Sequence, residues 1–115
     1  HGTVWVEYQN GDGHPGWLYG DVKFIVFDLY SKFIFVDREF LLQRANNLTK
    51  GSVYIGNQEP LNKYVYKSQA LYKPYRRDGR FDILTKIKTE DIIDLYSHEL
   101  PIPEQFHSDL YRTNK

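Results

Sequence analysis

Apolar and β-branched side chains are concentrated in three short runs near the start of the chain. Residues 3–8 and 22–29 are rich in valine, isoleucine and aromatic residues, which is the composition of β-strands. The run at 22–29 shows almost no polar alternation, so we expect a central strand that is covered on both faces and lies beside strand 3–8. Residues 30–32 can turn the chain into a partner strand at 33–36, which would complete a short hairpin.

The hydrophobic period then changes to that of a helix at residues 38–47. Asp37 precedes this segment as its expected N-cap, and Glu39 in the first turn favours the positive end of the helix dipole. The sequence therefore predicts a helix with one buried face, and the apolar stripe on that face consists of Phe40, Leu41, Ala45 and Leu48.

The second half of the chain shows shorter patterns. Residues 52–55 predict a short strand, and residues 56–62 predict a loop. Residues 80–88 alternate between apolar and polar side chains, which predicts a half-exposed strand. Its expected inward side chains are Phe81, Ile83 and Ile87, and its expected outward ones are Asp82, Lys86 and Lys88.

A short helix is expected next, with Thr89 as its cap and acidic residues in its first turn. Its expected inward side chains are Ile92, Ile93 and Tyr96. Prolines at positions 101 and 103 end regular structure, so we expect an irregular tail over residues 105–115.

Composition limits the class of protein. A chain of 115 residues with 41% apolar and 17% aromatic content is long enough for one hydrophobic core, so we expect a single α/β domain over residues 1–115, with a mixed central sheet and short flanking helices. The absence of cysteine excludes disulfides and thiolate metal sites. No apolar run is long enough to span a bilayer, so we expect no membrane partner and a cytoplasmic location. Because the sequence starts at His1 and contains no methionine, we also expect that a natural segment precedes it.

Glu7 is the first candidate for chemistry, because it follows a buried strand and precedes the glycine-rich loop at residues 10–17. An acid in this position requires a metal ion, a base or a hydrogen-bond donor. The alternative is an ordinary strand-end acid that pairs with Lys23 or with backbone N–H groups. Trp17 can contact a ligand or cover the local core. Asp12 and Asp21 are weaker candidates for ligands of a metal site at Glu7, since most loop aspartates only satisfy turns. His14 is a weak candidate for a zinc ligand, because no histidine spacing indicates a zinc site.

A basic segment is concealed by the zero net charge of the whole chain. Residues 63–88 contain eight Lys or Arg and two Asp, a balance of +6, and acidic segments flank them. Cations interleaved with tyrosines are typical of surfaces that contact phosphates and stack on unpaired bases. We therefore expect a nucleic-acid partner, DNA rather than RNA, at Lys63, Lys67, Lys73, Tyr75, Arg76, Arg77 and Arg80. The alternatives are a solvated basic loop with packed tyrosines, or pairing with the acidic flanks within the chain or across a homodimer.

The first 48 residues carry a resemblance to a known family. The segment from Gly2 to Gln9 is similar to the pattern Gly-x-x-x-x-Glu-x-Lys, and a glycine loop at 13–16 and a strand at 22–27 follow it. This order of strand, loop, strand, strand and helix resembles the core of the PD-(D/E)XK nuclease superfamily, in particular its viral and phage-type members. The resemblance implies a restriction-endonuclease-like fold, with Glu7 as a ligand of Mg²⁺ or Mn²⁺ and Gln9 at the position of the catalytic lysine. Lys23 would then replace that lysine, and an upstream aspartate would complete the metal site.

Two classes of function follow from these patterns. The resemblance implies a Mg²⁺-dependent endonuclease, or a descendant that binds nucleic acid without cleaving it. The contrasting class is a non-enzymatic interaction module of a phage or plasmid protein. A second carboxylate near Glu7 would favour the enzyme, whereas a Glu7 that pairs within the fold would favour the module.

Overall fold

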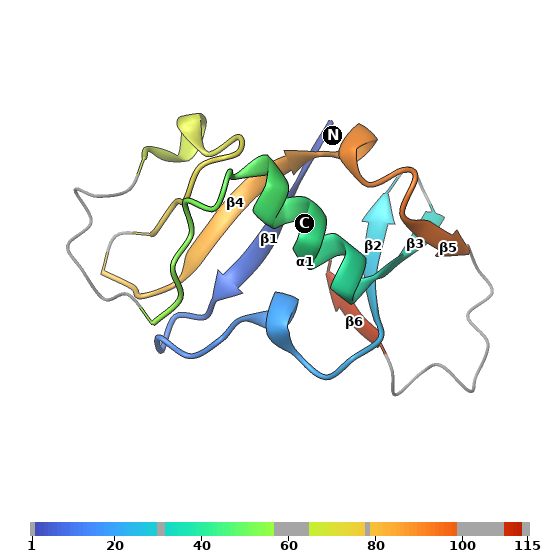
Figure 1. Ribbon diagram of the computed structural model, residues 1–115, viewed down its shortest axis with the longest axis horizontal. Helices are drawn as coiled ribbons and strands as arrows, with labels where there is room; N and C mark the ends of the chain where they lie inside the picture. The colour runs from blue at the N-terminus through green and yellow to red at the C-terminus, as the bar shows by residue number, and fades with distance from the viewer. Residues whose placement is uncertain (1, 30–31, 57–64, 78, 99–109, 114–115) are drawn as a thin grey trace.

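In the residues that the structure describes, two β-sheets and one α-helix form a mixed α/β domain (Figure 1). The computed structural model describes residues 2–29, 32–56, 65–77, 79–98 and 110–113. The smaller sheet pairs β1 (Thr3–Gln9) with β4 (Ile83–Lys88) in antiparallel fashion. The larger sheet has the strand order β5 (Tyr96–His98), β3 (Lys32–Asp37), β2 (Phe24–Leu29) and β6 (Leu110–Thr113). It is mixed, because β6 runs parallel to β2 while the other pairs are antiparallel.

Helical segments connect the strands. The single α-helix described, α1 (Arg38–Leu48), follows β3 directly and crosses in front of the sheets in Figure 1. Short 3₁₀ helices lie at η1 (Trp17–Tyr19), η3 (Lys67–Gln69) and η4 (Thr89–Asp91).

Strand β2 confirms the expectation of a central strand with two buried faces. Ile25 and Phe27 belong to the main core, whereas Phe24 and Val26 belong to a second apolar cluster on the opposite face. The expected neighbour was wrong, because β2 lies between β3 and β6, and β1 is in the other sheet. The inward side chains of β1 still meet those of β2, since both strands contribute to the main core. The two apolar strands therefore pack through their side chains and do not share backbone hydrogen bonds.

The helix prediction holds at its start and fails at one side chain. The Asp37 carboxylate accepts a hydrogen bond from the Phe40 N–H at 3.0 Å, which confirms the N-cap. Leu41 and Ala45 are fully buried, but Phe40 is 55% exposed. Phe40 directly precedes Leu41, and this places it about 100° around the helix from the buried stripe.

Other expectations need correction. Residues 52–55 form no strand, and Thr89 lies inside η4, whose N-cap position belongs to Lys88. Ile92 is buried as expected, whereas Ile93 is exposed. Tyr96 begins strand β5, and Leu110–Thr113 forms strand β6 where an irregular tail was expected. Within the expected loop, residues 57–62 lie outside the described part of the chain, as do residues 30–31 of the expected turn.

Strand β4 starts later than the alternation indicated. It begins at Ile83, and a bulge between Glu7 and Gln9 on β1 shifts the register there. Residues 80–82 therefore do not continue the pleat, so Phe81 is exposed and Asp82 is fully buried, the reverse of the expectation.

Candidate functional site

Glu7 is held by the backbone of the glycine-rich loop. Its Oε1 accepts a hydrogen bond from the Trp17 N–H at 3.4 Å. Gly16 donates to the Tyr8 carbonyl at 2.8 Å, and this draws the loop back against β1. A Cβ atom at Gly16 would lie 2.7 Å from the Glu7 carbonyl oxygen and 2.9 Å from Oε1. The approach therefore requires glycine, and the carboxylate has the backbone partner that the alternative interpretation expected.

Burial raises the pKa of the Glu7 carboxyl above its ordinary value. The Trp17 N–H acts in the opposite direction, the negative charge of Asp82 raises the pKa further, and the cations Arg77 and Arg80 lower it. A second carboxylate therefore lies within electrostatic range of Glu7, together with two arginines. The arrangement holds a partly buried acid in a cluster of mixed charge.

The second carboxylate is that of Asp82, and it is paired with Arg77. The Asp82 side chain is fully buried, accepts from the Arg77 N–H at 3.3 Å and forms an ion pair with the Arg77 guanidinium. Arg76 is only 3% exposed, and its guanidinium donates to the carbonyl oxygens of Phe81 and Asp82, both at 3.4 Å. The prediction of Arg76 as a surface phosphate contact is therefore wrong, because its guanidinium is buried among backbone carbonyls.

The two residues proposed to replace the catalytic lysine have other partners. Gln9 is fully buried; its Nε2 donates to the Phe81 carbonyl at 2.6 Å, and its Oε1 accepts from the Gly56 N–H at 2.6 Å. The Lys23 Nζ lies 3.9 Å from the Asp37 Oδ2 at the start of α1 and 5.4 Å from the centre of the Phe24 ring. Gln9 therefore ties β1 to two neighbouring segments, and Lys23 pairs with an acid other than Glu7.

The donor set near Glu7 does not fit a Mg²⁺ ion in this arrangement. Hard divalent ions bind several carboxylate and water oxygens. Within the described ranges, no group of three or more His, Cys, Asp or Glu side chains gathers at one place. Asp82 could join Glu7 as a ligand only after it left Arg77.

The loop residues serve the fold. The Trp17 ring meets Phe27 edge-on at 6.3 Å and packs against the main core, which agrees with a covering role. The Asn10 side chain accepts from the N–H groups of Asp12 at 3.0 Å and His14 at 3.1 Å, so it closes the turn itself. Asp21 is exposed after η1.

The basic segment divides into two parts. Its second part contains Arg77 and Arg80. Arg77 pairs with Asp82, and Arg80 lies beside the glycine loop, where a Cβ atom at Gly11 would be 2.6 Å from its guanidinium. Tyr75 packs on β1, with the centre of its ring 5.4 Å from that of Trp5.

The first part is more open. Lys67 and Lys73 are exposed, and the Tyr66 ring is 79% exposed. Lys63 lies outside the described residues. The exposed cations and ring that the nucleic-acid prediction requires are thus found at residues 66–73, and Tyr54 adds a second exposed ring from the segment after α1.

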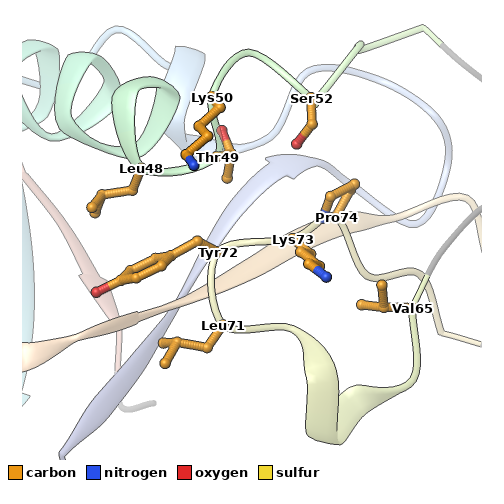
Figure 2. Close-up of a pocket in the computed structure, with 9 residues that line it drawn as sticks. All are labelled: Leu48, Thr49, Lys50, Ser52, Val65, Leu71, Tyr72, Lys73 and Pro74. Atoms are coloured by element: carbon orange, nitrogen blue, oxygen red, sulfur yellow. The ribbon is translucent and has the colours of Figure 1, made fainter.

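Beside this first part lies a pocket that the sequence reasoning missed. It has a volume of about 510 Å³ and lies between the end of α1 and the segment at 65–74, as Figure 2 shows. We call it the lysine pocket, and its lining consists of Leu48, Thr49, Lys50, Ser52, Val65, Leu71, Tyr72, Lys73 and Pro74. Among these nine residues the charged ones are both lysines, so the pocket combines apolar walls with positive charge.

The upper wall of the lysine pocket is the end of α1. The Lys50 N–H donates to the Asn47 carbonyl at 3.2 Å, and the Gly51 N–H donates to the Asn46 carbonyl at 3.1 Å. These bonds form a Schellman motif with Lys50 at the left-handed position, where its φ is 55°. Glycine is the usual residue there, because a side chain in this conformation is strained. The adjacent lysine and glycine after the helical pattern were the sequence signal for this motif.

The lower wall is tied to β4 and η4. The buried Thr85 hydroxyl lies within hydrogen-bond distance of two carbonyls, Ala70 at 2.9 Å and Lys73 at 3.0 Å. Tyr72 has a φ of 49°, and its hydroxyl donates to the Asp91 carboxylate. Burial and this carboxylate raise the pKa of Tyr72 to about 12, so the phenol stays protonated as a donor. These hydrogen bonds hold the lower wall, which forms the floor of the pocket, in place.

Comparisons with known proteins add no family to this geometry. No protein-family model matches the chain, and no curated protein or solved structure matches it significantly. In the part of the chain that the structure describes, no helix has the length and apolar character to cross a bilayer.

Proposed function

We propose that this protein binds single-stranded nucleic acid, DNA in the first instance, through the surface around the lysine pocket. The observation that supports this most directly is that exposed cations and an exposed ring occur together at residues 66–73, beside a positively charged pocket. Lysines at such a surface contact phosphates, and a free tyrosine ring stacks on a base of any type.

The contribution of each side chain follows from its exposure. Lys67 and Lys73 act as phosphate contacts, and Tyr66 acts as a stacking platform because its ring is 79% exposed. Tyr75 is less suitable for stacking on a base, since its ring already packs on Trp5.

Fluorescence anisotropy with labelled single-stranded and duplex DNA over a salt series tests the proposal. Replacing both Lys67 and Lys73 by glutamine removes two phosphate contacts, so the log–log salt slope should fall by about 1.4 for single strands. Tyr66→Ala should weaken binding by about 1–3 kcal/mol and leave the salt slope unchanged, because stacking releases no counterions.

Matched controls exist elsewhere on the surface. Lys23→Gln removes one exposed cation near α1, and Phe40→Ala removes an exposed ring on α1 itself. Both variants should bind as the parent does. If neither form of DNA binds the parent at low salt, the nucleic-acid proposal is wrong and the protein-interaction module becomes the better account.

Metal-dependent cleavage in a restriction-endonuclease-like core is a second candidate, and the electrostatic interaction of the Asp82 carboxylate with Glu7 favours it. It requires Asp82 to be released from Arg77, so the ion would have to reorganise the cluster. Mn²⁺ titration calorimetry on the parent and on Glu7→Gln tests it. Binding to the parent that Glu7→Gln abolishes would support this candidate, and equal binding or no binding would remove it.

A further inference from the structure

We infer that the lysine pocket binds a phosphorylated nucleotide unit, and specifically the phosphorylated end of a nucleic-acid strand. The inference rests on the proposed function, and it adds that the protein distinguishes strands by the chemistry of their ends. Three features of the pocket carry it: its set of hydrogen-bond donors, its size and the backbone conformation of Lys50.

The polar groups of the pocket suit a phosphate. A phosphate dianion only accepts hydrogen bonds, and the lining offers the ammonium groups of Lys50 and Lys73 and the hydroxyl of Ser52 as donors. The Thr49 hydroxyl is already committed, since it donates to the Ala45 carbonyl at 2.9 Å. No acid occurs among the nine lining residues to repel the ligand. Figure 2 shows Lys50 and Ser52 reaching from the upper wall toward the opposite segment.

The remaining walls suit a sugar and a base. Leu48, Val65, Leu71 and Pro74 supply apolar surface, and the ring of Tyr72 lies along one side of the pocket. A volume of about 510 Å³ lies within the range of small-ligand sites and accommodates one nucleoside monophosphate. A bare inorganic anion would leave this apolar surface unused, so the lining favours a nucleotide over phosphate alone.

The strain at Lys50 indicates that its side chain has a role. Glycine would fill the left-handed position of the Schellman motif at lower conformational cost, yet a lysine stands there with φ at 55°. A cation near the end of α1 also favours the helix dipole. A lysine one turn earlier would provide the same effect without left-handed backbone, so the dipole alone does not account for the position. A lysine at this position places an ammonium group at the wall of the pocket, and this accounts for the residue.

The test uses oligonucleotides of one sequence with a 5′-phosphate, a 3′-phosphate or hydroxyl groups at both ends. Anisotropy competition should show one phosphorylated form binding about tenfold more tightly than the hydroxyl form, as expected for one charge-assisted contact. Lys50→Gly should abolish this preference and leave the affinity for the hydroxyl form within about twofold. Glycine is favoured at this position, so a loss of preference cannot come from unfolding, and a thermal melt verifies this.

Ser52→Ala should reduce the preference, and Lys67→Gln is the control because Lys67 lies outside the pocket. It should weaken all three oligonucleotides equally and preserve the ratio between them. Free nucleoside monophosphate and inorganic phosphate serve as competitors and distinguish a strand end from a free nucleotide and from a simple anion.

The outcomes separate the two proposals. Equal binding of all three oligonucleotides overturns the end-recognition inference and leaves nucleic-acid binding intact. If no oligonucleotide binds but nucleoside monophosphate does, with loss in Lys50→Gly, the pocket is a free-nucleotide site and the proposed function fails. Competition by inorganic phosphate as strong as that by the nucleotide overturns the nucleotide assignment.

Discussion

Arg77→Gln removes the cation that faces the fully buried carboxylate of Asp82. The two partners differ in exposure, because the Arg77 side chain is 48% exposed and that of Asp82 is fully buried. Loss of Arg77 leaves a buried charge without its counterion, whereas loss of the Asp82 charge leaves a guanidinium that water can reach. The two single substitutions should therefore have unequal effects on stability.

The magnitudes follow from that asymmetry. Removing one partner of a buried ion pair costs about 3–5 kcal/mol, and we expect about 3 kcal/mol for Arg77→Gln because solvent borders the arginine side of the pair. Asp82→Asn keeps an oxygen that can accept from the Arg77 N–H, so we expect about 1–2 kcal/mol. In the double variant no charge remains buried, so it should be more stable than Arg77→Gln alone.

Urea denaturation followed by far-ultraviolet circular dichroism measures these free energies. With a typical slope for a domain of this size, Arg77→Gln should lower the midpoint by roughly 1–2 M and Asp82→Asn by less than about 1 M. Equal losses, a larger loss for Asp82→Asn, or a double variant no more stable than Arg77→Gln would each show that the pair is not stabilised in the way we describe.

Three further changes test other parts of the structure. Burial raises the pKa of Glu7 above the ordinary 4.5, so the folded state holds this proton more tightly than the unfolded chain and loses stability as pH rises through the raised pKa. Glu7→Gln should therefore be more stable than the parent at pH 7 and show no such advantage at pH 3.5. A stability advantage that does not change with pH in urea titrations would refute this. Gln9→Leu leaves the Gly56 N–H without its side-chain acceptor and removes the closer of the two side-chain donors to the Phe81 carbonyl, which keeps Arg76 at 3.4 Å. Thermal denaturation should therefore show a loss of about 1–3 kcal/mol, and a loss below about 0.5 kcal/mol would contradict this. Ile25→Ala should cost about 2–5 kcal/mol, and fast amide exchange at Ile25 in the parent would contradict its buried central position.

Local patterns were sufficient to predict the early elements of the fold. The apolar runs of β1, β2 and β3 leave a readable period in the sequence, and the start of α1 at Asp37 leaves a readable cap. The pairing of β1 with β4 depends on residues far apart in sequence, and the apolar run of β2 does not specify which strand lies beside it.

The candidate site was harder to predict, because a count of charges does not show where each charge is used. Arg76 and Arg77 add to the positive total of their segment, yet one is buried and the other balances Asp82. The bulge on β1 and the late start of β4 reverse the burial of Phe81 and Asp82, and the alternation of apolar and polar residues could not indicate this. The lysine pocket arises from two segments that meet only in the folded chain, so no local pattern marks Lys50 as one of its residues.

The pairing of β1 with β4 also determines when the pocket can form. Thr3 pairs with Lys88, so this sheet closes a loop that includes most of the chain, and Thr85 in the same strand anchors the floor of the pocket. Loop closure over such a distance is entropically costly, whereas the contiguous β2, β3 and α1 segment needs only local contacts. We expect that segment to fold first during synthesis and the pocket to be completed only when the strand ending at Lys88 has docked. A ligand that binds the pocket would then slow the opening of the whole β1 and β4 sheet, and it would act on the lifetime of the native state as well as on its equilibrium stability.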